Sequence, residues 1–331
     1  MILLDATYVN TGGGKVLLDY LIKKIIHKKL NFFFLLDYRT KDSYSFLEKH
    51  VVYIKSSFLQ RHFFYLKNKN TFDSVISFGN IPPSVKLNCV VHTYFQNVLF
   101  IENKFYSLKF ILKKIIFNTL LKNTDYFLVQ SELVKKQLSK KIDKNKIVVY
   151  PFFESNFISE RNKIDVKKIN FIYVSSGEKY KNHINLLKAF EKYNKRFPES
   201  CLTLTISEHY TGLLTLIEKM KKNRINIKNL GNLKHYDLIK EYAKADVMIF
   251  PSKNESFGLG LLEAAQMNMP VISSELDYVF QIIKPSATFN PDNYISIYNC
   301  MCNYEEFYKT PSKSIITNKI DKMLNFIINN E

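Results

Sequence analysis

The chain has 331 residues, of which 46% are hydrophobic and only 9 are Gly and 9 Pro. This length and composition predict a folded protein of about two domains and exclude a chain rich in flexible linkers. Lys and Arg number 48 against 30 Asp and Glu, a formal net charge of +18. Such an excess indicates an acidic partner: a nucleic acid, an anionic membrane surface or a phosphorylated substrate.

The cysteines show neither metal-ligand nor redox spacing, since Cys89, Cys201, Cys300 and Cys302 lie far apart or in a Cys-x-Cys pair. They indicate structural thiols in a reducing compartment. The chain opens on a strand-like run without a basic leader. Its apolar runs all fall short of the roughly 20 residues of a membrane span. We therefore expect a cytoplasmic protein without a membrane-spanning anchor.

The first 150 residues alternate short strand-like runs with helical patterns. One helix is expected over 15–29, where Leu18, Ile22 and Ile25 mark an apolar face. Strands that alternate with helices predict a doubly wound, largely parallel α/β sheet. The predicted strands are "ILLDATYV", "NFFFLLDY", "VVYIK", "SVISFG", "CVVHTYF", "DYFLVQS" and "KIVVYPF".

A polar, charged segment headed by Pro151 interrupts this alternation, which then restarts at "INFIYVSS". We predict two Rossmann-like doubly wound domains that face a cleft, over 1–152 and 153–310, with 311–331 as a C-terminal helix that can cross back to the first domain. The second domain should contain strands at "INFIYVSS", "CLTLTIS", "INIKNLG", "DVMIFPS" and "PVISS" and helices near 182–197, 211–223, 235–244 and 258–268.

Three glycines occupy the first strand-to-helix turn, in the stretch "NTGGGK" at 10–15. Their spacing fits neither a P-loop nor the dinucleotide-binding G-x-G-x-x-G pattern, because Val9, Val16 and Leu17 stand at required positions. The turn nevertheless places backbone N–H groups at a helix N-terminus, where an anion or polar ligand is favoured. By itself, this stretch fits a tight turn and a ligand site equally well.

The stretch "DVMIFPSKNESFGLGLLEAAQMNMPVISS" at 246–274 carries the strongest chemical signal. A buried strand ends at Pro251, a loop carries Glu255, and a helix is expected to begin at about Gly258 with Glu263 more than a turn inside it. Side chains tilt toward the N-terminus of a helix, so Glu263 can reach toward a ligand held by the free N–H groups there. A phosphate at the helix N-terminus and a ribose diol beside Glu263 fit this arrangement.

This combination closely resembles the E-x7-E signature of the retaining GT-B glycosyltransferases of family 4, the glycosyltransferase group 1 enzymes of polysaccharide and O-antigen biosynthesis. The resemblance covers nearly the whole chain and implies an acceptor-side first domain and a nucleotide-sugar-binding second domain. It implies that Glu255 contacts the donor sugar and Glu263 the ribose. Backbone contacts to the sugar and diphosphate are expected from Ser256, Phe257, Gly258 and Leu259.

Two further segments are similar to the donor site of this family. "SSGEKYKNHINLLKAF" is similar to its donor-phosphate segment, which implies that Lys181 holds the diphosphate. The arginine of the family is missing; Ser175 or Ser176 stands in its place, and Lys179 could substitute for it. "LGNLKHYDLIKEYAKADV" is similar to the part that packs on the nucleobase, which places Leu233 at the donor.

In the first domain, "CVVHTYF" places His92 like the family histidine beside the reacting sugar, although a histidine on an apolar strand is more often a core residue. In this context Gly13 and Gly14 are expected to lie at the donor, which favours the ligand-site reading of the glycine turn. The chain departs from the family at Gly260, usually a proline, and at Asn268, commonly a glycine.

We therefore expect a retaining, metal-independent transferase that moves a sugar from a UDP- or GDP-linked donor to a glycan hydroxyl, without a cofactor and without a nucleic-acid partner. The acceptor implied by the family is a lipid-linked bacterial surface polysaccharide intermediate. The metal-binding Asp-x-Asp motif of the other glycosyltransferase architecture does not occur in the chain. The alternatives are a nucleotide-sugar epimerase, a glycan phosphorylase, or a non-enzymatic basic protein that binds membranes or nucleic acids.

The stretch "NKFYSLKFILKKIIFNTLLKN" at 103–123 mixes lysines with large apolar residues. It fits a helix that lies on the anionic inner face of the cytoplasmic membrane. It fits equally well a packed helix with a solvated lysine edge. Lipid-linked acceptors, which are common in the resembling family, slightly favour a peripheral membrane contact.

Overall fold

The computed structural model describes residues 1–101, 108–155, 168–303 and 310–329. The chain forms two compact units. Unit 1 comprises Met1–Glu154 and Thr317–Glu331, and unit 2 comprises Ser155–Ile316. None of the helices within the described ranges is long and apolar enough to cross a membrane.

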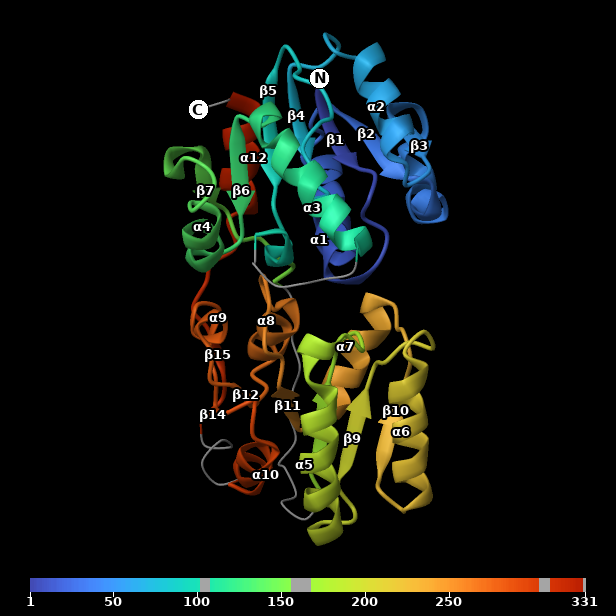
Figure 1. The fold of residues 1–331 in the computed structure, drawn as a ribbon, viewed down its shortest axis with the longest axis vertical. Coiled ribbons are helices and arrows are strands. Elements are labelled where there is room, and N and C mark those ends of the chain that lie inside the picture. Colours follow the sequence, from blue (N-terminus) through green and yellow to red (C-terminus); the bar gives the residue numbers. More distant parts are fainter. Residues whose placement is uncertain (102–107, 156–167, 304–309, 330–331) are drawn as a thin grey trace. The chain divides into compact units, whose positions relative to one another are not determined.

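Unit 1 is built on a seven-stranded parallel sheet with the order β3-β2-β1-β4-β5-β6-β7 (Figure 1). The order reverses between β1 and β4, as in doubly wound sheets. Its strands are β1 (Ile2–Ala6), β2 (Phe32–Asp37), β3 (Val51–Ile54), β4 (Ser74–Ser77), β5 (Val90–Tyr94), β6 (Tyr126–Val129) and β7 (Ile147–Val149). Its α-helices are α1 (Gly12–His27), α2 (Phe58–Lys67), α3 (Leu108–Leu120), α4 (Glu132–Leu138) and α12 (Ile320–Asn329), and its 3₁₀ helices are η1 (Tyr38–His50), η2 (Val98–Phe100), η3 (Leu121–Asn123) and η4 (Lys144–Lys146).

Unit 2 repeats this plan with a six-stranded parallel sheet, in the order β10-β9-β8-β11-β12-β14, and a short antiparallel pair, β13-β15. Here the order reverses between β8 and β11. Its strands are β8 (Asn170–Tyr173), β9 (Cys201–Leu204), β10 (Ile227–Asn229), β11 (Val247–Phe250), β12 (Val271–Ser274), β13 (Ile283–Lys284), β14 (Ala287–Phe289) and β15 (Lys313–Ser314). Its helices are η5 (Lys179–Lys181), α5 (His183–Arg196), α6 (Thr211–Lys222), α7 (His235–Lys244), α8 (Leu259–Gln266), α9 (Asp277–Phe280) and α10 (Tyr294–Cys302).

Helices α2 and α12 cover opposite faces of the unit 1 sheet. Tyr65 of α2 packs in a hydrophobic cluster with Val75 and Val91. His92 points to the other face, because successive residues of a strand alternate, and its ring meets Phe326 of α12 at a centroid distance of 5.5 Å. The segment after unit 2 therefore completes the core of unit 1.

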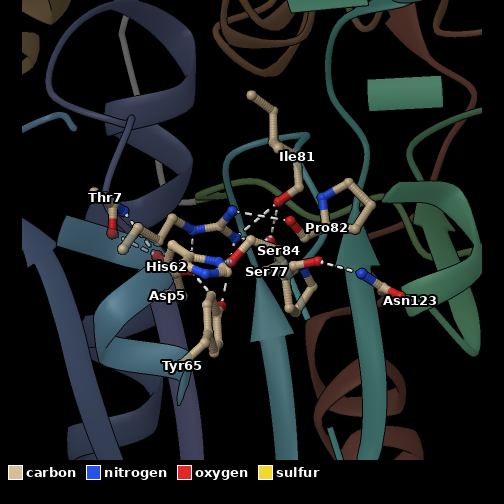
Figure 2. Close-up of polar contacts among 11 residues, drawn as sticks. Asp5, Thr7, His62, Tyr65, Ser77, Ile81, Pro82, Ser84 and Asn123 are labelled. Carbon is tan, nitrogen blue, oxygen red and sulfur yellow. Dashed lines mark hydrogen bonds and ion pairs between the residues drawn. The ribbon is translucent and has the colours of Figure 1, made fainter. Parts of the chain in front are cut away.

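A buried charge network ties α2 to the carboxyl ends of β1 and β4. The Arg61 side chain is 2% exposed and donates from Nε to Oδ2 of Asp5 at 2.6 Å. Its other N–H groups donate to the carbonyl oxygens of Ile81 and Pro82 at 2.8 and 2.9 Å, and the Tyr65 hydroxyl also donates to Asp5. Figure 2 shows Asp5 and Tyr65 within this network, with Ile81 and Pro82 above them. The loop after β4 is thus fixed to the first strand.

Replacement of Arg61 by Met should reduce the free energy of unfolding by about 3–5 kcal/mol, because Asp5 would remain buried without its cation. The matched control is Lys86→Met. Lys86 pairs with Asp125 at 3.2 Å and its side chain is 59% exposed, so a loss of less than about 1 kcal/mol is expected. Urea unfolding of both variants measures the difference, and equal losses would contradict a structural role for the buried pair.

Candidate functional site

Lys181 and Glu255 meet at the point where the strand order of unit 2 reverses. Lys181 ends η5, in the connection that follows β8, and Glu255 lies in the loop that follows β11. Because β8 and β11 are adjacent and parallel, the two connections leave the same edge of the sheet, where ligands bind in open α/β folds. Lys181 Nζ lies 2.5 Å from Glu255 Oε1, with the side chains 14% and 12% exposed. The structure therefore brings these two predicted residues together as an ion pair.

Asn182, the residue after Lys181, connects the loop after β8 to the loop after β11 by hydrogen bonds. Asn182 adopts a left-handed conformation with φ 64°, and its buried amide donates to the carbonyl oxygens of Pro251 and Pro291 at 3.1 and 2.8 Å. The hydroxyl of Tyr173 donates to the carbonyl oxygen of Lys181 at 2.8 Å. The backbone of Lys181 is thus anchored on both sides, and its side chain is held toward Glu255.

The predicted donor residue Ser176 is exposed and lies in the loop directly after β8. Burial lowers the pKa of His183 to about 4, so its imidazole is neutral. Nε2 can then donate to the Ser176 carbonyl oxygen at 2.9 Å, and it also lies 3.0 Å from Oγ of Ser175. The ring of Tyr210 lies so close to Gly177 that an added Cβ would come within 2.4 Å of it. Packing by His183 and Tyr210 therefore defines this loop.

Helix α8 points its N-terminus toward the same part of unit 2. Gly258 caps the helix in a left-handed conformation with φ 70°, which glycine adopts without strain. The N–H groups of the first turn carry the positive end of the helix macrodipole, and that of Leu261 donates to the Gly258 carbonyl oxygen at 2.9 Å. Ser256 is half-buried and Phe257 buried just before this cap. The predicted backbone-binding residues thus form one continuous turn.

Glu263, one turn further along α8, is 4% exposed and held by helix α7. Its Oε1 lies 2.7 Å from Nε2 of His235, and its Oε2 accepts from the Tyr242 hydroxyl at 3.1 Å. Leu233, expected at the nucleobase, is half-buried in the loop that leads into α7. Sequence reasoning missed both His235 and Tyr242. Their separation by two helical turns, which places them on one face of α7, is the pattern that could have revealed them.

The predicted glycines Gly13 and Gly14 lie in unit 1, within the first turn of α1. Gly13 is exposed, and an added Cβ there would meet nothing within 4 Å. At Gly14 an added Cβ would lie 3.1 Å from Oε1 of Gln96. Gln96 follows β5 and its backbone N–H donates to Oδ1 of Asn80 at 2.6 Å. Gln96 and Asn80 therefore shape the glycine turn, and sequence reasoning missed both.

The expectation that His92 contacts a sugar is wrong for this structure. His92 is 0% exposed. Its ring stacks on Tyr126 at a centroid distance of 5.7 Å and meets Phe326 edge to face, while Nδ1 lies 3.2 Å from Oγ of Ser74. Because residue 92 points sideways from the strand into the layer beneath α12, rather than out from the carboxyl end, it is a core histidine.

The segment that holds Lys181, Glu255 and Glu263 is similar in sequence to known proteins. Residues 154–290 match the family described as glycosyl transferases group 1. The serotype-specific mannosyltransferase WbdA of Escherichia coli is 31% identical over 123 residues, which are 36% of this chain and only 15% of WbdA. The O-antigen chain mannosyltransferase RfbU of Salmonella typhimurium is 26% identical over 254 residues, which are 70% of this chain and 67% of RfbU.

Solved structures share the whole architecture at low sequence identity. Anabaena HepE, determined in complex with UDP and glucose, covers 100% of this chain and 99% of its own, with a TM-score of 0.76 and 13% identity. The lipopolysaccharide outer core galactosyltransferase WaaB gives a TM-score of 0.66 and 15% identity over 100% and 99% of the two chains. The two parallel-sheet α/β units thus have the GT-B fold of glycosyltransferases. The sequence similarity to the glycosyl transferases group 1 lies in residues 154–290, nearly all of which belong to unit 2.

His92 gives a test of the corrected assignment. Burial lowers its pKa to about 4, below the value of about 6.5 of an unfolded histidine. Since the unfolded chain binds the proton first, stability is lost as pH falls from about 6.5 to about 4. His92→Phe keeps a ring but removes this titration, so the wild type should lose up to about 3 kcal/mol more than the variant between pH 7 and pH 4.

Urea unfolding at several pH values measures this difference, with the exposed His209→Phe as a control that should behave like the wild type. Equal pH dependence of the wild type and His92→Phe would contradict a buried, neutral His92.

Proposed function

We propose that the protein is a retaining, metal-independent glycosyltransferase that moves a hexosyl or related unit from a nucleotide-sugar to a glycan hydroxyl. The observation that carries this proposal is the meeting of Lys181 and Glu255 at the reversal of strand order in unit 2, beside a helix that continues to the buried Glu263. A cation, a helix N-terminus and a second carboxylate further along that helix match the phosphate and ribose of a nucleoside diphosphate sugar.

The proposed reaction needs only groups of the chain and the two substrates. The acceptor oxygen forms the new glycosidic bond on the face from which the diphosphate leaves, and the bond between the anomeric carbon and the phosphate oxygen breaks. The departing phosphate oxygen takes the acceptor proton. Lys181 and the N-terminus of α8 stabilise the negative charge that develops on the diphosphate, while Glu255 orients the sugar. No cofactor is required.

Glu255 has a second part in this proposal, because it neutralises Lys181 before the donor arrives. An ammonium group that is only 14% exposed is costly without a counter-ion. The donor diphosphate replaces this carboxylate as the partner of Lys181, and the released carboxylate is then free to accept hydrogen bonds from the sugar hydroxyls. Donor binding and sugar orientation are thus coupled through one ion pair.

The comparisons support a bacterial surface polysaccharide as the acceptor class, since the names of WbdA, RfbU and WaaB refer to serotype, O-antigen and lipopolysaccharide. A lipid-linked acceptor would place the enzyme at the inner face of the cytoplasmic membrane. Helix α3 supports this placement: its Ile111, Leu112 and Ile115 are exposed, at 37%, 55% and 53%. Part of the basic stretch 103–123, residues 103–107, lies outside the described residues.

Lysine side chains lie near these apolar side chains. Lys113 is exposed on α3, and burial together with the charge of Lys114 lowers the pKa of Lys141. This lowering means that positive groups from α3 and from the segment after α4 lie close to each other. Apolar side chains beside like-charged lysines are the composition of a surface that binds anionic lipid.

Lys181→Ala should reduce turnover at least about tenfold and weaken binding of the preferred nucleoside diphosphate, because the diphosphate loses its cation. The control is Lys188→Ala, an exposed lysine on α5, and Lys179→Ala tests whether this lysine replaces the missing arginine. Titration calorimetry with UDP and GDP, with and without EDTA, measures binding. Donor turnover measures catalysis.

A wild-type protein that is folded but binds neither UDP nor GDP would contradict the proposal and direct attention to a non-enzymatic function. Binding that EDTA abolishes would contradict metal independence alone.

The membrane surface is tested by sedimentation with vesicles of phosphatidylglycerol or of phosphatidylcholine. The wild type should bind the anionic vesicles preferentially, and Lys113→Ala should weaken this binding about fivefold. Leu112→Ser with Ile115→Ser should weaken binding to both vesicles by removing apolar area. Ile184→Ser, an exposed residue of α5 at 48%, is the control. Unchanged binding of the α3 variants would place the membrane contact elsewhere.

A further inference from the structure

Both carboxylate oxygens of Glu263 are held by one helix. His235 begins α7 and Tyr242 follows two turns later on the same face. Nε2 of His235 lies 2.7 Å from Oε1 and the Tyr242 hydroxyl lies 3.1 Å from Oε2. A carboxylate can only accept hydrogen bonds, so Nε2 of His235 carries the proton in this contact. Burial and the neighbouring Glu263 raise the pKa of Tyr242 well above its usual range, which keeps its hydroxyl a donor.

The two donors from α7 stabilise the buried Glu263 carboxylate but use only part of its capacity to accept hydrogen bonds. A carboxylate that is 4% exposed is costly unless donors surround it. Each of its oxygens accepts about two hydrogen bonds, and α7 supplies one to each. One acceptor position per oxygen is therefore available for a ligand diol, in an orientation that the two donors fix in advance.

The glycine at position 260 explains why Tyr242 can reach this carboxylate. An added Cβ at Gly260 would lie 3.2 Å from the Tyr242 hydroxyl oxygen, closer than ordinary van der Waals contact. Gly260 and Tyr242 therefore fit each other closely in this chain.

We infer that His235 and Tyr242 are positioning residues that orient Glu263 for the two hydroxyls of a ribose, and so make the donor site selective for ribonucleotides over 2′-deoxyribonucleotides. This inference rests on the proposed function. The segment that is expected to pack on the nucleobase, Gly231 to Leu233, lies just before helix α7, which begins at His235. The contact between α7 and Glu263 therefore fixes the positions of the base-binding loop and the ribose-binding carboxylate relative to each other.

The test is titration calorimetry with UDP, GDP and their 2′-deoxy forms. The wild type should bind the ribonucleotide at least about tenfold more tightly, because loss of the 2′-hydroxyl leaves a hydrogen bond to a charged group unmade. In His235→Ala and Tyr242→Phe this ratio should fall to about threefold or less, since Glu263 is no longer oriented. His235→Gln, whose amide can donate in place of Nε2, should restore part of the ratio. His209→Ala is the matched control at an exposed position.

Gly260→Ala supplies a second measurement that does not remove any polar group. Alone, it should lower the ratio, but by less than Tyr242→Phe does, because its methyl group would lie 3.2 Å from the hydroxyl oxygen and shift it away from Glu263 without removing it. Added to Tyr242→Phe it should have no further effect, because the oxygen that it would meet is gone.

Different results would overturn the proposed function and the inferred role of His235 and Tyr242. If the folded wild type binds neither ribonucleotide, both the proposed function and this inference are overturned. If the wild type binds one of them and His235→Ala and Tyr242→Phe keep the full preference for the 2′-hydroxyl, the inference alone is overturned.

Discussion

The architecture of the site depends on one constraint: opposite charges from two neighbouring loops are held together where little water reaches them. Lys181 and Glu255 come from connections that diverge after β8 and β11, and their side chains are 14% and 12% exposed. Separation of the pair without a substitute partner would leave a nearly buried charge. The loops therefore keep their positions in the absence of ligand, and Asn182 fixes their backbones.

Unit 1 also contains a buried ion pair, but that pair stabilises the fold. The pair of Asp5 and Arg61 also lies where the strand order reverses, but these side chains are 1% and 2% exposed and Arg61 is surrounded by carbonyl acceptors. Arg61 is therefore out of reach of a ligand, whereas Lys181 keeps part of its surface in contact with solvent. The degree of exposure, rather than the presence of an ion pair, distinguishes the structural pair from the one that we propose to bind the donor.

Much of this organisation is predictable from the sequence, because alternating strand and helix periods fix the doubly wound plan and the spacing of Glu255 and Glu263 fixes their relation to α8. The residues that the sequence predicted wrongly or missed have roles that depend on contacts between distant parts of the chain. The resemblance of "CVVHTYF" to the family implies a sugar contact for His92, yet the face on which it lies is decided by the pleat and by Phe326, more than 200 residues away. His235 and Tyr242 were missed because their partner lies on another helix, and Gln96 because its role depends on a glycine turn that precedes it by 80 residues.

Helix α12 belongs to unit 1 although the whole of unit 2 precedes it in the chain. Its Phe326 covers His92 and Tyr126, and the Asn318 amide before it donates to the Tyr20 hydroxyl at 2.9 Å. During synthesis, the part of the first sheet around His92 and Tyr126 therefore lacks the cover of Phe326 until residues beyond Thr317 have left the ribosome. Unit 2 can complete its fold earlier, so the domain that is translated first is the last to be finished.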